Sequence, residues 1–335
     1  MKKNVLHLLL AFCLIIPLAS CHRGNNGIWK NDEINSDIKA QLAQLNRKLF
    51  NSIMAKDIDA VKALLSDKLI QKSGNKLDTL VNTSAQSFAA KDFEVLDEYY
   101  TKHHVKGTPD TLSPNKNAND YLVSYKAMNE EMYTSLLVTK GLPVNCLILA
   151  VYGKYGNDWK INVLQIGEYS IEDKTAPDYY KLATDQYKKG SLVDASNTMI
   201  ITSQLANPAG DFFKYRNEDT MRIFFSTVIN EANNRFQFPV IVSWVKTKPQ
   251  IFSVSPQFVE EAAHRGIFPI IKYKSSIKLT DTVALRAENN AIQQHIGDLF
   301  KGVDRDKKYI LYQAFNQMPD GKIADKHYGF IQNLK

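Results

Sequence analysis

Apolar residues that recur every three or four positions predict a helical start to the folded chain. The spacing holds over about five turns, which is typical of a helix with one buried face. The residues on this face are Ile34, Ile38, Leu42, Leu45, Leu49 and Ile53. Similar spacing predicts a shorter helix over residues 57–69, where Asp57 can cap the first turn, and a third over residues 79–90.

Strand patterns follow these helices. Residues 93–105 carry a mixed pattern, and residues 121–138 contain one or two strands, with an interruption at residues 129–131. Between them, residues 108–119 are rich in Pro, Asn, Thr and Ser, which is typical of a loop. We therefore expect a sheet whose first strands are separated by this loop.

The strongest strand signal is a predicted β-hairpin. Residues 144–155 and 159–171 flank the turn sequence Gly-Asn-Asp, and Trp159, Ile161 and Val163 alternate with polar residues. The alternation slips at Val163, after which Leu164 carries the apolar phase, as expected if one residue is bulged.

The second half of the chain predicts further helices and strands. Helices are expected over residues 182–207 as a hairpin, over 218–234 and over 282–300. The strand-like runs are residues 238–245, 250–254, 267–274, 308–315 and 327–331, of which the last two read as a closing hairpin. This order suggests an α+β domain with an antiparallel sheet, so the fold class predicted for the whole chain is α+β.

The N-terminus reads as an export segment. Lys2 and Lys3 precede an apolar stretch of residues 5–17, which is shorter than the roughly 20 residues a membrane-spanning helix needs. The stretch ends in Leu-Ala-Ser-Cys at residues 18–21. This sequence resembles the lipobox of bacterial lipoproteins, which implies that residues 1–20 are removed and that Cys21 is acylated. An ordinary secretory peptide or a buried helix is the alternative.

The resemblance implies a membrane as one partner, reached through the lipid on Cys21. His22 and Arg23 follow the cysteine where lipoproteins retained in the inner membrane often carry Asp. We therefore expect an outer-membrane anchor facing the periplasm. Residues 21–33 are polar and rich in Gly and Asn, which predicts a flexible tether.

The positive net charge is only a weak argument for a nucleic-acid partner, and the export segment argues against one. The net charge of +7 falls to +5 when Lys2 and Lys3 are removed, and the other basic residues are interspersed with acidic ones. Cys146 is then the only thiol besides Cys21, so the mature chain has no disulfide available within it.

Two family resemblances suggest the domain organisation. The opening helix, the segment 50–69 and the closing Asp-Trp-Lys-Ile at 158–161 resemble the nuclear-transport-factor-2-like fold, which implies a cone of curved antiparallel sheet wrapped on a long helix over residues 34–172. Residues 182–208 resemble one tetratricopeptide repeat, which implies a helical-hairpin linker over residues 173–212. Residues 213–335 form the expected C-terminal α+β domain.

Candidate chemistry is sparse. Metalloprotease, nucleophile-elbow and phosphate-loop motifs are absent from the sequence, and we predict neither a metal site nor a cofactor. Asp97, Tyr99 and His103 are spaced to share one face of a strand, and if that face lines the cone they are the catalytic or ligand-binding candidates. An outward polar face is the alternative.

Four Asp-Thr-apolar sequences resemble acceptors of a general O-glycosylation system in some bacterial envelopes. Their threonines are Thr79, Thr111, Thr220 and Thr282. Asp-Thr is also a common turn or helix start, which is the other interpretation.

The function predicted from these features is a lipid-anchored, non-enzymatic envelope protein that binds a partner protein, peptide or small ligand. A periplasmic enzyme with an acid/base pocket in the cone and a structural spacer stay open as alternatives, because the nuclear-transport-factor-2-like fold serves all three roles.

Overall fold

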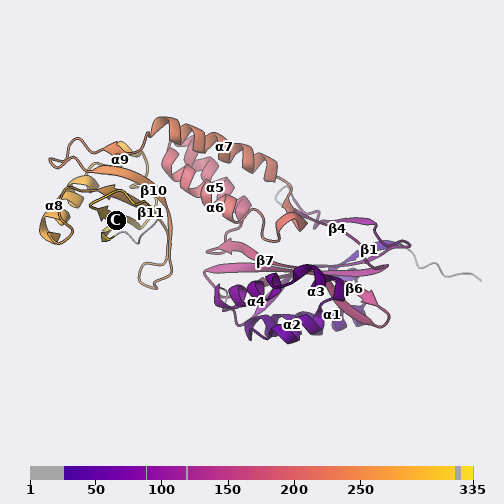
Figure 1. Ribbon diagram of the computed structural model, residues 1–335. Coiled ribbons are helices and arrows are strands. Elements are labelled where there is room, and N and C mark those ends of the chain that lie inside the picture. Colours follow the sequence, from indigo (N-terminus) through magenta and orange to yellow (C-terminus); the bar gives the residue numbers. More distant parts are fainter. Residues whose placement is uncertain (1–25, 88, 118–119, 321–325, 335) are drawn as a thin grey trace, which may run out of the picture.

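The computed structural model describes residues 26–87, 89–117, 120–320 and 326–334. Within these residues the chain has the α+β fold that the sequence predicts, built on three β-sheets. Figure 1 shows an N-terminal lobe of sheet and helices, a C-terminal lobe, and a layer of helices between them. No helix in the described ranges is long and apolar enough to cross a membrane.

Helices α1 to α4 cover one face of a five-stranded sheet in the N-terminal lobe (Figure 1). The helices are α1 (Ser36–Met54), α2 (Ile58–Leu64), α3 (Asp67–Ser73) and α4 (Lys76–Ser87). The strand order is β1 (Gly27–Lys30), β2 (Phe93–Lys102), β5 (Glu131–Thr139), β6 (Val144–Tyr155) and β7 (Asp158–Ile171), with every neighbouring pair antiparallel.

The predicted amphipathic helix is confirmed, because α1 buries its apolar stripe against this sheet. Leu42, Leu49 and Ile53 pack with Leu137 and Trp159 in one core cluster. These side chains fill the space between the helix and the sheet. Burial of their apolar surface stabilises the packing of α1 by roughly 25 cal/mol per Å².

The predicted helix over residues 57–69 is two helices. Asp57 caps α2 by accepting a hydrogen bond from the Ala60 N–H (3.0 Å), as expected. The helix then breaks because Leu65 is extended and bridges Ile161 of β7, while Ser66 caps α3. Contact with β7 therefore interrupts a helical pattern that continues in the sequence.

The predicted hairpin is also confirmed. Strands β6 and β7 are antiparallel neighbours, and Tyr152 faces Ile161 while Val151 faces Val163. Asn162 is therefore the extra residue of a bulge, one position before the slip seen in the sequence.

A three-stranded sheet covers the other face of the five-stranded sheet. It has the order β3 (Pro109–Leu112), β4 (Tyr121–Lys126) and β8 (Phe213–Tyr215). The prediction of a loop throughout residues 108–119 is therefore wrong at β3, which buries Asp110 and Leu112. Strand β8 joins β4, so residues 213–215 lie in the N-terminal lobe although the sequence prediction began the C-terminal domain at 213.

The predicted tether over residues 21–33 contains regular structure. Residues 27–30 form β1, which pairs antiparallel with β2, and Asn31–Glu33 form a 3-10 helix. Trp29 packs on Tyr100 with ring centroids 5.3 Å apart. This aromatic contact and the strand pairing hold a polar segment that composition alone assigns to a flexible linker.

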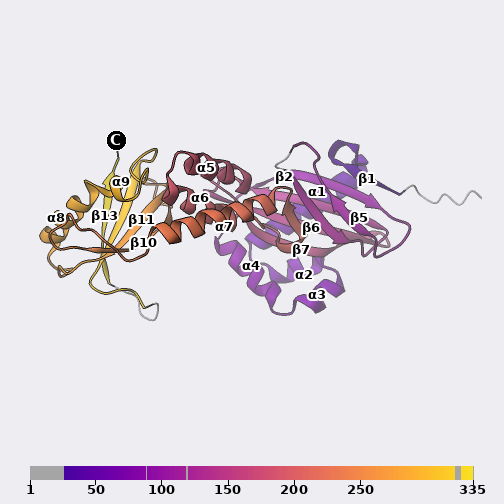
Figure 2. The same cartoon turned by 90° about the horizontal axis from the view of Figure 1, so that it is seen from above.

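Three helices lie between the lobes (Figure 2). They are α5 (Ala176–Lys188), α6 (Leu192–Gln204) and α7 (Glu218–Arg235). Helices α5 and α6 form the predicted hairpin, and α7 packs on it because Phe224 contacts Tyr180 and Tyr187. The sequence prediction placed α7 in the C-terminal domain. In the structure Phe224 of α7 packs on α5, so α7 belongs to the helical layer between the lobes.

The C-terminal sheet is mixed. Its order is β13 (His327–Asn333), β12 (Tyr309–Phe315), β11 (Gly266–Lys274), β10 (Gln250–Val259) and β9 (Val240–Ile241). Strands β11 and β12 are parallel, which corrects the prediction of an antiparallel sheet. A connection containing α8 (Thr282–Gln293) and α9 (Ile296–Leu299) joins them, and such a crossover returns the chain in the same direction.

Candidate functional site

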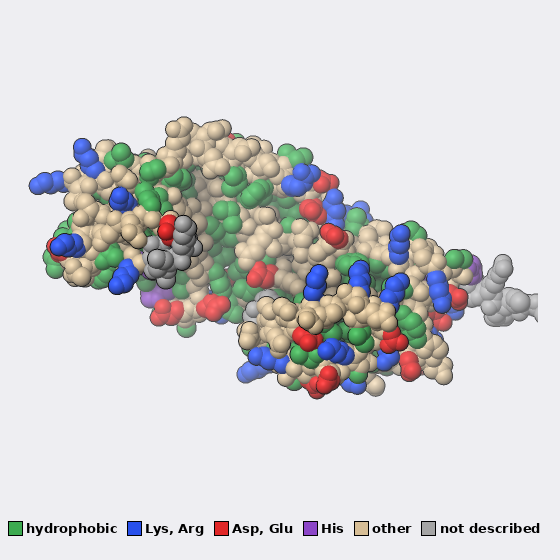
Figure 3. Space-filling view, viewed as in Figure 1, with side chains coloured by type: hydrophobic (Ala, Val, Ile, Leu, Met, Phe, Trp, Pro, Cys, Tyr) green, Lys and Arg blue, Asp and Glu red, His purple; other side chains and the backbone are tan. Residues whose placement is uncertain are grey.

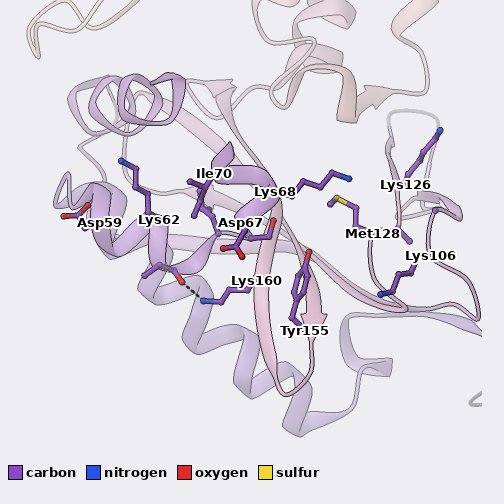
Figure 4. A pocket seen from close by; sticks show the side chains of 15 residues that line it. Asp59, Lys62, Asp67, Lys68, Ile70, Lys106, Lys126, Met128, Tyr155 and Lys160 are labelled. Carbon is purple, nitrogen blue, oxygen red and sulfur yellow. Dashed lines mark hydrogen bonds between the residues drawn. The ribbon is translucent and has the colours of Figure 1, made fainter. Parts of the chain in front are cut away.

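A groove runs beside β7 in the N-terminal lobe, between the helices and the three-stranded sheet. It consists of a cavity of about 1100 Å³, drawn in Figure 4, and a second of about 590 Å³. The two cavities share Lys68, Lys126 and Met128 as lining residues, so they form one continuous depression. We call this depression the lysine groove.

Lysines dominate the ionisable groups of the lysine groove. Seven line it: Lys62, Lys68, Lys72, Lys76, Lys106, Lys126 and Lys160. Only two acidic residues do so, Asp59 and Asp67, which leaves a net charge of +5 (seven minus two). Figure 3 shows Lys and Arg side chains gathered over this lobe.

Two of these lysines are held by the protein itself. Lys62 forms an ion pair with Asp78 at 3.2 Å, and Lys160 donates a hydrogen bond to the carbonyl oxygen of Ala63 at 2.7 Å (Figure 4). Within the described residues the side chains of the other five have no hydrogen-bond or ion-pair partner. Their exposed ammonium groups are therefore available to an anionic ligand.

The floor of the lysine groove is largely apolar. Its apolar lining residues are Ala63, Leu65, Leu69, Ile70, Leu77, Leu80, Ala127, Met128, Val163, Leu164 and Phe212. Val163 and Leu164 belong to β7, whereas the leucines before residue 81 come from α3 and α4 or the residues beside them. A groove with an apolar floor and an ammonium rim is complementary to a ligand that carries both apolar groups and negative charge.

Local structure explains how three of the lysines come together. Lys68 and Lys72 lie one turn apart on α3, so they project from the same side of that helix. Gly74 ends α3 with a φ of +50°, a conformation that glycine adopts without strain, and Lys76 opens α4. The spacing of these three lysines by four residues is the feature of the sequence from which this part of the groove could be predicted.

Asp97, Tyr99 and His103 lie outside the lysine groove. Tyr99 belongs to the core cluster between the two sheets, whereas Tyr100, the next residue, packs with the helices. Asp97 and Tyr99 therefore face the three-stranded sheet and not α1. Asp97 and Tyr99 thus share one face of β2, the face remote from α1, whereas His103 lies just beyond the strand, which ends at Lys102.

Asp97 is enclosed by internal partners. Its carboxylate accepts hydrogen bonds from Asn31 Nδ2 (2.8 Å) and from the Tyr121 hydroxyl, and Lys30 Nζ lies 3.7 Å away. Burial, together with nearby Tyr99 and Asp97, raises the pKa of Tyr121, so its hydroxyl stays protonated as a donor. The carboxylate thereby ties β1 and β4 to β2.

His103 pairs with a different carboxylate. Its Nε2 lies 3.0 Å from Asp110 Oδ2, which also accepts a hydrogen bond from the Thr101 hydroxyl at 3.2 Å. The structure therefore brings Asp97 and Tyr99 together near Tyr121 but separates His103 from them. This arrangement joins β2 to β3.

A smaller cavity of about 250 Å³ lies beside Asp97 and is also lined by Asp120 and Asp178. The Asp120 carboxylate accepts hydrogen bonds from the N–H groups of Lys116 and Asn117. Asp178 caps α5 by accepting from Thr175. These carboxylates therefore have structural partners inside the protein.

The predicted modification sites are placed as follows. Cys21 lies outside the described residues. The four glycosylation candidates are exposed: Thr79 on α4, Thr111 on β3, Thr220 on α7 and Thr282 on α8. Cys146 is buried, and burial raises the pKa of its thiol, which keeps it in the less nucleophilic protonated form.

Comparison with models of known protein families, with curated proteins and with solved structures finds no match for this chain. The lipobox and the nuclear-transport-factor-2-like resemblance therefore stay predictions from the sequence. The candidate site rests on the geometry and charge of the lysine groove.

Proposed function

We propose that this protein is a non-enzymatic binding protein of the cell envelope, anchored through a lipid on Cys21, and that the lysine groove binds an acidic ligand. The observation that carries the proposal is the juxtaposition of five unpaired lysines with an apolar floor. Charge draws the ligand to the groove, and apolar contact retains it.

The lining of the groove favours binding over catalysis. Its charged groups are seven lysines and two aspartates, its other ionisable groups are the phenols of Tyr125 and Tyr155, and its described lining contains no histidine or cysteine. An acid/base reaction commonly needs groups that exchange protons near neutral pH, whereas an exposed lysine stays charged there. The groove therefore presents fixed positive charge to its ligand.

Titration of the purified protein with fluorescent poly-L-glutamate tests the proposal. Lys68→Gln with Lys126→Gln removes two charges from the point where the two cavities meet. An exposed charge pair contributes about 0.2–1 kcal/mol, so the double variant is expected to bind about 2- to 30-fold more weakly. Added salt should reduce the difference, because it screens exposed charges.

The matched control is Lys181→Gln with Lys188→Gln. Both lysines are exposed on α5, and neither lines the groove. The control removes the same charge from the whole molecule and should leave the affinity unchanged. Equal weakening by the two double variants would show that poly-L-glutamate responds to net charge, and it would overturn the proposal.

A further inference from the structure

The lysine groove contains an open sheet edge. Strand β7 is the last strand of the five-stranded sheet, and β6 is its only neighbour strand within the described residues. On its other side, the Ser66 N–H donates to the Ile161 carbonyl oxygen at 2.9 Å, beside the Leu65–Ile161 bridge. Beyond this contact, the outer edge of β7 is free of a pairing strand until the Ile171–Lys174 bridge.

Four consecutive residues of this edge line the groove: Asn162, Val163, Leu164 and Gln165. Successive side chains of a strand point to opposite faces of the sheet, so a cavity that touches four in a row faces the strand's edge. At Gly167 the chain passes over one face of the sheet, since an added Cβ would lie 2.4 Å from the carbonyl oxygen of Pro208, and the Ile171–Lys174 bridge closes the edge beyond it. The open stretch is therefore short and bounded.

Walls rise on both sides of this edge. The helical wall presents Leu69, Leu77 and Leu80 with Lys68, Lys72 and Lys76. The other wall presents Tyr125, Lys126, Met128 and Phe212. A chain lying along β7 would therefore meet apolar side chains on both faces and ammonium groups on both rims.

We propose that an extended acidic peptide segment of a partner protein binds in the lysine groove by adding a strand to the β7 edge. The inference deepens the proposed function and rests on it. Unpaired backbone N–H and C=O groups of an edge strand are a template for another strand, and side-chain contacts supply the specificity. The rim lysines select negative charge, and the bounded edge selects an extended backbone.

An acidic peptide explains both features of the groove together. A free anion or an anionic lipid headgroup would satisfy the lysines and leave the β7 backbone unpaired. A second copy of this chain would have to present a negatively charged strand, whereas the described edge itself is rimmed by lysines. Charge complementarity therefore favours a different, acidic partner.

Two synthetic peptides of equal length and charge separate strand addition from simple charge attraction. The alternating peptide (Glu-Val)5 can form a strand, whereas (Glu-Pro)5 carries the same acidic groups but lacks every second backbone N–H. Affinities would be measured with the unmodified purified protein by calorimetry. Amide hydrogen exchange would report protection at β7. Because no residue is changed, misfolding of a variant cannot account for a difference between the peptides.

The expected result is that (Glu-Val)5 binds at least about tenfold more tightly than (Glu-Pro)5, a ratio that corresponds to one or two net hydrogen bonds. It should also slow exchange of amides in residues 162–166. Equal affinities without protection would overturn strand addition and leave the acidic-ligand function standing. Failure of both peptides in a protein that binds poly-L-glutamate would also overturn it.

Two further outcomes would identify a different occupant of the lysine groove. Protection of β7 that depends on protein concentration without peptide would assign the edge to a second copy. Phosphatidylglycerol vesicles that displace poly-L-glutamate while (Glu-Val)5 does not would assign the groove to a lipid. Either result would overturn the peptide inference, and the second would retain an anionic ligand for the lysine groove.

Discussion

Removing the ammonium group of Lys307 should destabilise the junction between α6 and the C-terminal lobe. Lys307 Nζ lies 3.0 Å from Asp194 Oδ2, with side-chain exposures of 14% and 9%. The same nitrogen donates to the carbonyl oxygens of Gly302 (3.0 Å) and Arg305 (2.7 Å). Lys307→Met would leave a buried carboxylate without its cation.

The expected loss is about 3–5 kcal/mol, because breaking a buried ion pair from one side leaves an uncompensated charge. In thermal unfolding this is a fall in Tm on the order of 6–20 °C. Asp194→Asn should cost less, about 1.5–3 kcal/mol for a lost charged hydrogen bond, because Lys307 keeps two carbonyl acceptors. The double variant should recover part of the Lys307→Met loss.

The stability deficit of Lys307→Met, meaning its loss in free energy of unfolding relative to the parent, should also depend on pH. Burial already raises the pKa of Asp194, partly opposed by Lys307, so removing Lys307 raises it further. A folded-state pKa above the unfolded value means that the folded state takes up a proton first as pH falls. The deficit should therefore shrink from pH 7 towards about pH 4, the usual pKa of Asp.

Circular dichroism melts of the parent and three variants at several pH values measure these changes. The reasoning is refuted if Asp194→Asn costs as much as Lys307→Met, or if the Lys307→Met deficit is the same at every pH. An unchanged Tm in all variants would show that the pair contributes nothing to the junction.

Three other predictions follow from the structure. Tyr152→Phe should lower the free energy of unfolding, measured in urea, by about 1–3 kcal/mol, because it leaves buried Asn46 Oδ1 without the hydroxyl that donates to it at 2.9 Å. The control Tyr187→Phe removes a hydroxyl at the surface and should lower it by less than about 0.5 kcal/mol. Cys146 should react with a thiol reagent only after denaturation, since it is buried; rapid reaction of the native protein would contradict this. Cys21→Ser should abolish incorporation of labelled palmitate in cells and release the protein from the membrane fraction; persistent labelling would place the lipid elsewhere.

Periodic patterns made the long elements predictable. Helix α1 buries one stripe and β7 alternates between two faces, so each carries a repeating signal along its own sequence. The short strands β1 and β8 carry no such signal. Three or four residues are too few to show a period, and their pairing with β2 and β4 depends on residues far away in the chain.

Strand direction and the site were harder to predict for related reasons. The parallel pairing of β11 with β12 depends on how the connection through α8 crosses the sheet. The lysine groove collects residues from position 59 to position 212, and only the spacing of Lys68, Lys72 and Lys76 is local. The polar spacing in the sequence instead indicates Asp97 and Tyr99 on β2 and His103 just beyond it, and these residues serve contacts between sheets.

Strand β1 shortens the predicted tether between the membrane and the folded protein. With β1 beginning at Gly27, five residues separate it from Cys21, and the six steps from Cys21 to Gly27 reach at most roughly 22 Å. A lipid on Cys21 would therefore hold the β1 edge close to the bilayer. Strand β7 lies at the opposite edge, four strand spacings or about 19 Å away across the sheet. The anchored edge would face the membrane, and the open edge would face the space beyond it.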